Sequence, residues 1–211
     1  MPTETTPVRI AVFGSFYRGF HVLSELLKGP IAPRVQVVGV ATDDVGAPFI
    51  SRERRVWAYP HTQQEETMVE ELALAHGLDL YKGRVKTAEF YRRYEEQWRP
   101  DICIAATFGQ RIDARLFQFP ARGFYNLHPC IDDGWPSHYA GPNPFQALLD
   151  SRSDHVAIAM HAVDDGFDTG RLVGLSEKIY VPPGASVVDL HKISSPLAAK
   201  FFAHELSKML T

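Results

Sequence analysis

The fold class follows from residues 8–27, which read VRIAVFGSFYRGFHVLSELL. Residues 8–13 form a short apolar run of the length of a buried strand, and residues 20–27 carry apolar side chains at helical spacing. Gly14 and Gly19 lie between the two runs, where the chain has to turn from strand to helix. A buried strand that leads through such a turn into a helix is typical of the first unit of an α/β fold.

The rest of the first half repeats this alternation of short apolar runs and amphipathic segments. We expect buried strands at residues 35–41 and 102–108, and helices at residues 65–76 and 87–98 between them. Residues 42–62 lack such periodicity and are expected to form a long loop. The alternation predicts an α/β, Rossmann-like, mostly parallel sheet with helices on both faces.

The second half has shorter elements and more turn residues. The expected elements are, in chain order, a strand at 123–128, a loop at 132–144, a helix at 143–150, strands at 155–163 and 172–181, and a final helix capped by Ser186. No repeat or linker interrupts this order. We therefore expect a single domain at residues 8–211, after a disordered tail at residues 1–7.

The composition is that of an ordinary globular protein. The chain has 211 residues, of which 45% are hydrophobic and 22% are charged, enough to bury a core without disulfides or metals. Cys103 lies in a strand-like run and Cys130 in a loop, which favours free thiols and a cytoplasmic location. A net charge of -3 without a basic run argues against a large nucleic-acid footprint. No signal peptide and no membrane-spanning segment are expected.

The turn at residues 14–19, GSFYRG, lies where doubly wound proteins bind phosphate groups. It does not fit the Gly-x-Gly-x-x-Gly pattern, and it lacks the lysine and the serine or threonine that complete a P-loop. A tight turn from strand to helix explains both glycines without a ligand. Alternatively, backbone N–H groups together with Ser15, Tyr17 and Arg18 hold anionic or hydroxyl groups of a substrate.

An amide, an imidazole and a carboxylate follow apolar runs in the second half. Asn126 and His128 are two residues apart on a predicted strand and therefore share one face of it. Asp168 lies between Gly166 and Gly170, which let its segment approach closely, and we expect the two strand ends to meet at one edge of the sheet. An amide for an oxyanion, an imidazole for protons and a carboxylate to orient the imidazole are the parts of an acyl-transfer site.

Each of these motifs also has a simpler interpretation. The aspartate-rich segment fits a solvated turn, whereas a calcium loop needs alternating oxygen ligands that residues 169–172 do not supply. His138 and Cys130 are the candidate zinc ligands near His128, but their spacing is not diagnostic, and we expect no metal site. Pro129 is expected to turn the chain directly after His128.

The combination resembles the formyltetrahydrofolate-dependent formyltransferase family, in particular the catalytic core of methionyl-tRNA formyltransferases and sugar N-formyltransferases. The resemblance is carried by Asn-x-His-Pro at residues 126–129 and Asp-x-x-Asp-x-Gly at residues 165–170. PDICIAATFGQRI at residues 100–112 and AGPNPFQ at residues 140–146 agree with it. The Gly-x-Gly-Ser-Asn loop of glycinamide ribonucleotide transformylases is absent, and we expect no C-terminal RNA-binding barrel.

The resemblance implies a formyltransferase-type fold, with residues 8–211 as a single catalytic domain. Asn126, His128 and Asp168 are then the catalytic trio, and N10-formyltetrahydrofolate is the formyl donor. The pterin would hydrogen-bond mainly to backbone groups of two segments, which comprise Phe108, Gly109, Gln110, Arg111, Ile112, Val163, Asp164, Asp165, Gly166 and Phe167.

The acceptor implied by the resemblance is a small-molecule amine. A nucleotide-linked amino sugar is the first expectation and an amino-acid-like amine the second, with no nucleic acid or membrane as partner and a homodimer left open. Asp132, Asp133 and Trp135 belong to a loop that departs from the family pattern. They either bind the acceptor together with the first turn, or they form a solvated turn with a tryptophan that anchors the core.

Two other functions remain open at this point. The same trio with water as the nucleophile would give a hydrolase that releases formate from formyltetrahydrofolate. A non-catalytic Rossmann-like binding module is the third hypothesis, against which the unbroken trio argues.

Overall fold

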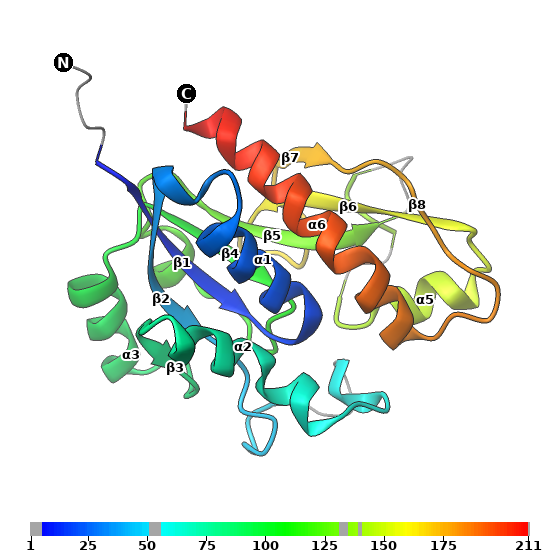
Figure 1. The fold of residues 1–211 in the computed structure, drawn as a ribbon, viewed down its shortest axis with the longest axis horizontal. Helices are drawn as coiled ribbons and strands as arrows, with labels where there is room; N and C mark the ends of the chain where they lie inside the picture. The colour runs from blue at the N-terminus through cyan, green and yellow to red at the C-terminus, as the bar shows by residue number, and fades with distance from the viewer. Residues whose placement is uncertain (1–5, 51–55, 131–134, 139–140, 211) are drawn as a thin grey trace.

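The computed structural model describes residues 6–50, 56–130, 135–138 and 141–210 as a central sheet between layers of helices (Figure 1). The strands are β1 (Val8–Gly14), β2 (Val35–Ala41), β3 (Leu80–Tyr81), β4 (Ile102–Ala106), β5 (Phe124–Cys130), β6 (His155–Ala162), β7 (Leu172–Leu175) and β8 (Ile179–Tyr180). The main helices are α1 (Phe16–Lys28), α2 (Gln63–Ala75), α3 (Ala88–Arg92), α4 (Ala114–Phe117), α5 (Pro144–Asp150) and α6 (Val187–Met209). Short helical segments lie at Ala32–Arg34, Val56–Ala58 and Arg93–Trp98, the last of them π-helical.

The strands are hydrogen-bonded in the order β3-β2-β1-β4-β5-β6-β7, and β8 pairs with β6. From β3 to β5 every neighbouring pair is parallel. β6 then pairs antiparallel with β5, and β7 pairs antiparallel with β6. This arrangement confirms the expected mostly parallel α/β sheet.

Side chains along β1 alternate between two separate cores. Ile10 and Val12 belong to the core shared with α1, α2 and α6, whereas Ala11 and Phe13 belong to the core shared with α3 and the π-helical segment. A parallel strand that is covered on both faces has to be apolar at successive positions, which explains the continuous run in the sequence. The long helix α6 packs against α1, and both helices cover the same face of the sheet (Figure 1).

The first turn is tight because the backbone at the end of β1 touches the first turn of α1. A Cβ atom on Gly19 would lie 2.6 Å from the carbonyl carbon of Gly14, so neither position accommodates a side chain without a shift. The helix begins at Phe16, four residues before the expected start. The first turn of the helix could not be predicted from apolar spacing, because one of its buried residues is the polar Arg18.

Strand β5 continues past the point at which Pro129 was expected to turn the chain, and that expectation was wrong. Pro129 pairs with Ile158 and Cys130 with Ala157, so Cys130 is buried at a strand end and not in a loop. The carbonyl of Phe124 accepts a hydrogen bond from the β6 side. By strand alternation, the nitrogen of Pro129 faces the other side, beyond the end of β4, where no ladder hydrogen bond is lost.

The orientation of β6 corrects a second expectation. Because β6 is antiparallel, its end at Ala162 pairs with Tyr125 near the beginning of β5, so the two strands do not end at the same edge. The segment after β6 must therefore fold back to carry Asp168 toward His128. The single strand expected at residues 172–181 is also divided into β7 and β8.

Several smaller elements differ from the sequence expectations. β3 and α4 were not anticipated because two and four residues are too short to display a period. Ser186 caps α6 as expected, with a hydroxyl that accepts from the backbone N–H of Asp189. Residues 1–5 of the expected tail and residues 51–55 of the expected loop lie outside the described residues.

Candidate active site

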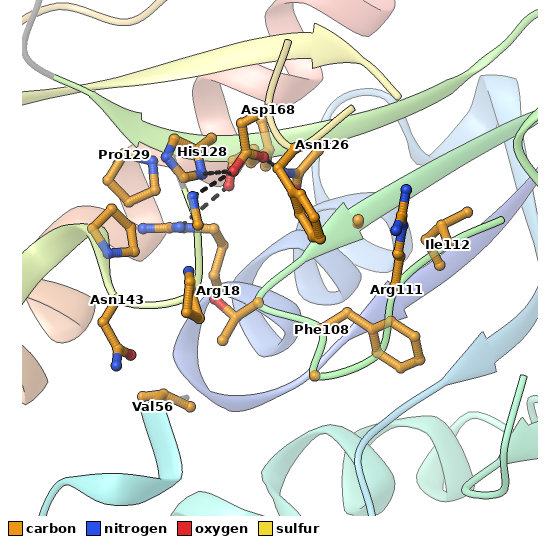
Figure 2. Close-up of a pocket in the computed structure, with 18 of the residues that line it drawn as sticks. Arg18, Val56, Phe108, Arg111, Ile112, Asn126, His128, Pro129, Asn143 and Asp168 are labelled. Atoms are coloured by element: carbon orange, nitrogen blue, oxygen red, sulfur yellow. Dashed lines mark hydrogen bonds and ion pairs between the residues drawn. The ribbon is translucent and has the colours of Figure 1, made fainter. Parts of the chain in front are cut away.

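A cavity of about 460 Å³ opens beyond the carboxyl end of β4, where open α/β sheets bind their ligands. Its wall is formed by α1, β5, the loops after β2, β4 and β6, the entry to α5 and the beginning of α6. Figure 2 shows Asn126, His128 and Asp168 gathered at one side of this cavity. The predicted trio is therefore brought together, from a strand and from a loop that approaches from the opposite direction.

The carboxylate of Asp168 connects the other two members of the trio. Its Oδ1 accepts a hydrogen bond of 3.1 Å from Nδ2 of Asn126, and its Oδ2 lies 3.4 Å from Nδ1 of His128. Oδ2 also accepts from the backbone N–H of Gly141 at 3.1 Å. The backbone of Asp168 has a φ of 52°, a left-handed conformation that aspartate tolerates better than most residues.

The surroundings of Asp168 keep its carboxylate ionised. Burial alone would raise its pKa, but the contact with His161, the charge of His128 and the N–H of Gly141 outweigh burial and lower the pKa to about 2. A carboxylate that is charged at every ordinary pH favours a proton on the imidazole of His128, which is itself only 4% exposed. The pair thus places a buried imidazole beside a charged carboxylate.

His161 is a site residue that the sequence reasoning missed. Its Nδ1 lies 2.8 Å from the carbonyl oxygen of Ala162, which places the proton of the neutral ring on Nδ1. Its Nε2 then accepts from Nδ2 of Asn126 at 3.3 Å and lies 3.4 Å from Oδ1 of Asp168. His161 is the cross-strand partner of Asn126, so only knowledge of the β5–β6 pairing could have revealed it.

Trp135 packs against His161 and is not among the residues that line the cavity. Its ring lies on that of His161 with a centroid distance of 4.7 Å, and its Nε1 donates to the carbonyl of Gly170 at 2.7 Å. These contacts favour the anchoring interpretation of Trp135 over direct substrate binding. Asp132 and Asp133, which were expected to bind the acceptor, lie outside the described residues.

The two segments expected to bind the pterin both line the cavity and contact each other. Phe108, Arg111 and Ile112 line one side in Figure 2. Nη2 of Arg111 donates to the carbonyl of Asp165 at 2.7 Å, and its guanidinium lies 4.8 Å from the ring centre of Phe167. Of the ten residues predicted there, Asp165 alone does not line the cavity.

Asp43 holds the loop after β4 in place and was not anticipated. Its Oδ1 accepts from the N–H of Gly109 at 2.9 Å, and its Oδ2 accepts from Nε1 of Trp57 at 3.0 Å. Asp43 also lines the cavity. It therefore joins the loop after β2 to one of the two segments expected to bind the pterin.

The sequence of the chain is similar to those of known proteins. The formyl transferase family matches residues 8–203. The chain belongs to this family. Methionyl-tRNA formyltransferase of Syntrophomonas wolfei is 27% identical over 191 residues, which are 90% of this chain and 56% of that protein. The chain thus spans about half the length of the curated relatives that it matches.

Solved structures of formyl transferases share the fold. Phosphoribosylglycinamide formyltransferase from Bacillus halodurans has a TM-score of 0.68 and 17% identity, covering 96% of this chain and 95% of that chain. A formyltetrahydrofolate deformylase from Pseudomonas syringae has a TM-score of 0.66 and 14% identity, covering 97% of this chain and 63% of that chain. The expected formyltransferase-type fold is confirmed.

Of the three substrate residues predicted in the first turn, one lies on the cavity wall. Arg18 lines the cavity. The hydroxyl of Ser15 accepts from the N–H of Asp43 at 2.9 Å, and the hydroxyl of Tyr17 donates to Glu65, so both side chains are engaged elsewhere. Among the described residues no group of three or more metal-ligating side chains is found. No described helix is long and apolar enough to cross a membrane.

Proposed function

We propose that the protein transfers a formyl group from N10-formyltetrahydrofolate to a small-molecule amine. The observation that carries this proposal is the Asp168 carboxylate, which joins Asn126, His128 and the N–H of Gly141 on the cavity wall. Membership of the formyl transferase family supports the same reaction. The names of its relatives point to acceptors as different as methionyl-tRNA and phosphoribosylglycinamide.

In the proposed reaction the amine nitrogen attacks the formyl carbon, and the carbonyl oxygen becomes an oxyanion. The protonated ring of His128, held in that state by Asp168, stabilises the negative charge. The amine loses a proton and N10 of the folate gains one as the carbon–nitrogen bond breaks. The products are the N-formyl amine and tetrahydrofolate, so atoms and charges balance.

Asn126 has a role that depends on His161. Both hydrogens of its amide nitrogen have acceptors without substrate, one in Asp168 and one in His161. The contact with His161 is the longer of the two, 3.3 Å against 3.1 Å, so a developing oxyanion would compete first for the N–H that faces His161. We propose that this N–H donates to the oxyanion.

Incubation with N10-formyltetrahydrofolate, alone and with a panel of amines, tests the proposal. Amine-dependent formation of tetrahydrofolate together with an N-formyl product would support the transferase. Formate release at the same rate with and without amines would favour the hydrolase, and no consumption of the folate would favour a binding module. The Asp168→Asn variant serves as the control for uncatalysed transfer.

A further inference from the structure

Arg18 is a buried cation on the cavity wall, outside the two segments expected to bind the pterin. Its side chain is 2% exposed, yet it lines the cavity, and Figure 2 draws it below His128 and away from Phe108. Arg18 lies in the first turn of α1, and its side chain reaches the backbone of β5 at Leu127.

The contacts of Arg18 leave its charge uncompensated. Nη1 donates to the carbonyl of Leu127 and Nη2 to the hydroxyl of Ser194, each at 3.3 Å, and Nε has no hydrogen-bond partner. Within the described ranges no carboxylate lies at ion-pair distance from Arg18. Burial lowers its pKa to about 10, so the guanidinium is still charged at neutral pH. An unpaired buried charge is costly, and a protein retains one where a ligand completes it.

His191 supplies a second unpartnered polar atom on the same part of the wall. It extends from α6, lines the cavity, and its Nδ1 has no hydrogen-bond partner. Burial and the charge of Arg18 hold its pKa well below the usual range, so the ring is neutral. Phe145 packs against both side chains, with the Arg18 guanidinium 5.5 Å from its ring centre. Two polar side chains with incomplete hydrogen bonding thus lie together on the cavity wall.

We infer that the acceptor amine carries an anionic group, a carboxylate or a phosphate, that binds to Arg18 beside His191. This inference rests on the proposed formyl transfer. The carbonyl that Arg18 contacts belongs to Leu127, the residue between Asn126 and His128, so the anion lies close to the reacting carbon. The amine and the anionic group of the acceptor are therefore only a few bonds apart. A planar guanidinium binds either anion through paired N–H groups.

A purely structural role for Arg18 makes a different prediction. In that case the guanidinium would only tie α1 to β5 and α6, and its loss would lower stability whether or not an anion is present. Arg34 provides a matched control, since it also donates to a serine hydroxyl and a backbone carbonyl of the C-terminal segment, Ser207 and Leu210, but is exposed.

The test measures the unfolding midpoint Tm of the full chain in acetate, methyl phosphate or neutral acetamide at constant ionic strength. We expect at least one anion, and not acetamide, to raise the Tm of the wild type. In Arg18→Gln the apparent Kd of that anion should rise about tenfold or more, whereas Arg34→Gln should match the wild type. The acetate and phosphate arms identify the preferred anion.

Two results would overturn the inference. One is an unchanged Tm of the wild type in both anions, and the other is an equal anion-dependent increase in Arg18→Gln. The readout is the increase caused by the anion, so a lower starting Tm of the variant does not obscure it. If Arg18→Gln does not fold, Arg18→Lys, which keeps the charge without the paired N–H geometry, should retain a weakened increase.

A second assay separates this inference from the proposed function. Glycine is compared with glycinamide, and O-phosphoethanolamine with ethanolamine, as formyl acceptors. Faster formylation of an anionic amine than of its neutral counterpart, lost in Arg18→Gln, supports the inference. Equal rates for the two members of each pair would overturn it and leave the transferase intact. Anion binding at Arg18 with only formate release would overturn the transferase instead.

Discussion

Asn126 and Asp168 are joined by a hydrogen bond of 3.1 Å between Nδ2 and Oδ1, across 42 residues of sequence. An ionised carboxylate only accepts hydrogen bonds, so this contact fixes which end of the Asn126 amide faces Asp168. The same carboxylate lies 3.4 Å from His128. One side chain therefore contacts an amide donor and an imidazole at the same time.

Replacement of Asp168 by asparagine should remove both effects. The amide cannot favour a proton on His128, and its NH₂ group would compete with that of Asn126. We expect kcat for formyl transfer to fall on the order of a hundredfold or more, with the fold retained. Circular dichroism and steady-state kinetics check this. Asp154→Asn is the control, because 83% of that side chain is exposed, and near-normal turnover in a folded Asp168→Asn would refute the assignment.

Asp168 should also make stability depend on pH in the acid range. Its pKa is about 2 in the folded chain, below the ordinary aspartate value of 3.8, so the folded state binds its proton less readily than the unfolded state. The contribution of about 2 kcal/mol is complete above pH ~4 and is lost as the pH falls toward ~2. Urea unfolding across this range should show a steeper acid loss for the wild type than for Asp168→Asn. Parallel curves would contradict the pKa shift.

The sequence was sufficient for features that depend on local pattern. Continuous apolar runs predicted β1, β2 and β4 because strands buried on both faces need them. Asn126 and His128 could be assigned to one wall because strand residues two apart share a face. The motif around Asp168 was assigned to the same wall, although the expected route, two strands that end at one edge of the sheet, was wrong.

Features that depend on pairing between distant segments could not be predicted. His161 enters the site only because β6 pairs antiparallel with β5, and its sequence context is an ordinary half-buried strand. Arginine is rarely buried, so nothing in the sequence predicted that Arg18 is enclosed beneath β5 and α6. The antiparallel direction of β6 itself had no local signal.

Replacement of His161 by phenylalanine should weaken catalysis without weakening substrate binding. Phenylalanine keeps a ring against Trp135 but removes Nε2, the atom that contacts Asn126 and Asp168. We expect kcat to fall about tenfold or more, with little change in KM, because His161 holds Asn126 and Asp168 in positions that matter only for the charge of the transition state. Steady-state kinetics with saturating folate provide the measurement. An effect confined to KM would show that His161 contributes to binding only.

The segment that carries Asp168 should not tolerate a side chain at Gly170. A Cβ there would lie 1.8 Å from the carbonyl oxygen of Ala162, a backbone atom that cannot rotate away. Gly170→Ala should therefore displace the segment, lower the free energy of unfolding by about 1–3 kcal/mol and reduce kcat, since small displacements of catalytic groups are costly.

Gly184→Ala separates the loss of stability from the displacement of Asp168. Gly184 has a φ of 77° with nothing within 4 Å of a Cβ atom, so alanine there adds backbone strain of about 1–2 kcal/mol and no collision. We expect Gly184→Ala to be less stable than the wild type but equally active. Urea unfolding and kcat measured on both variants test this difference. Normal kcat in Gly170→Ala would mean that the position of Asp168 does not depend on the close approach of Gly170 to Ala162.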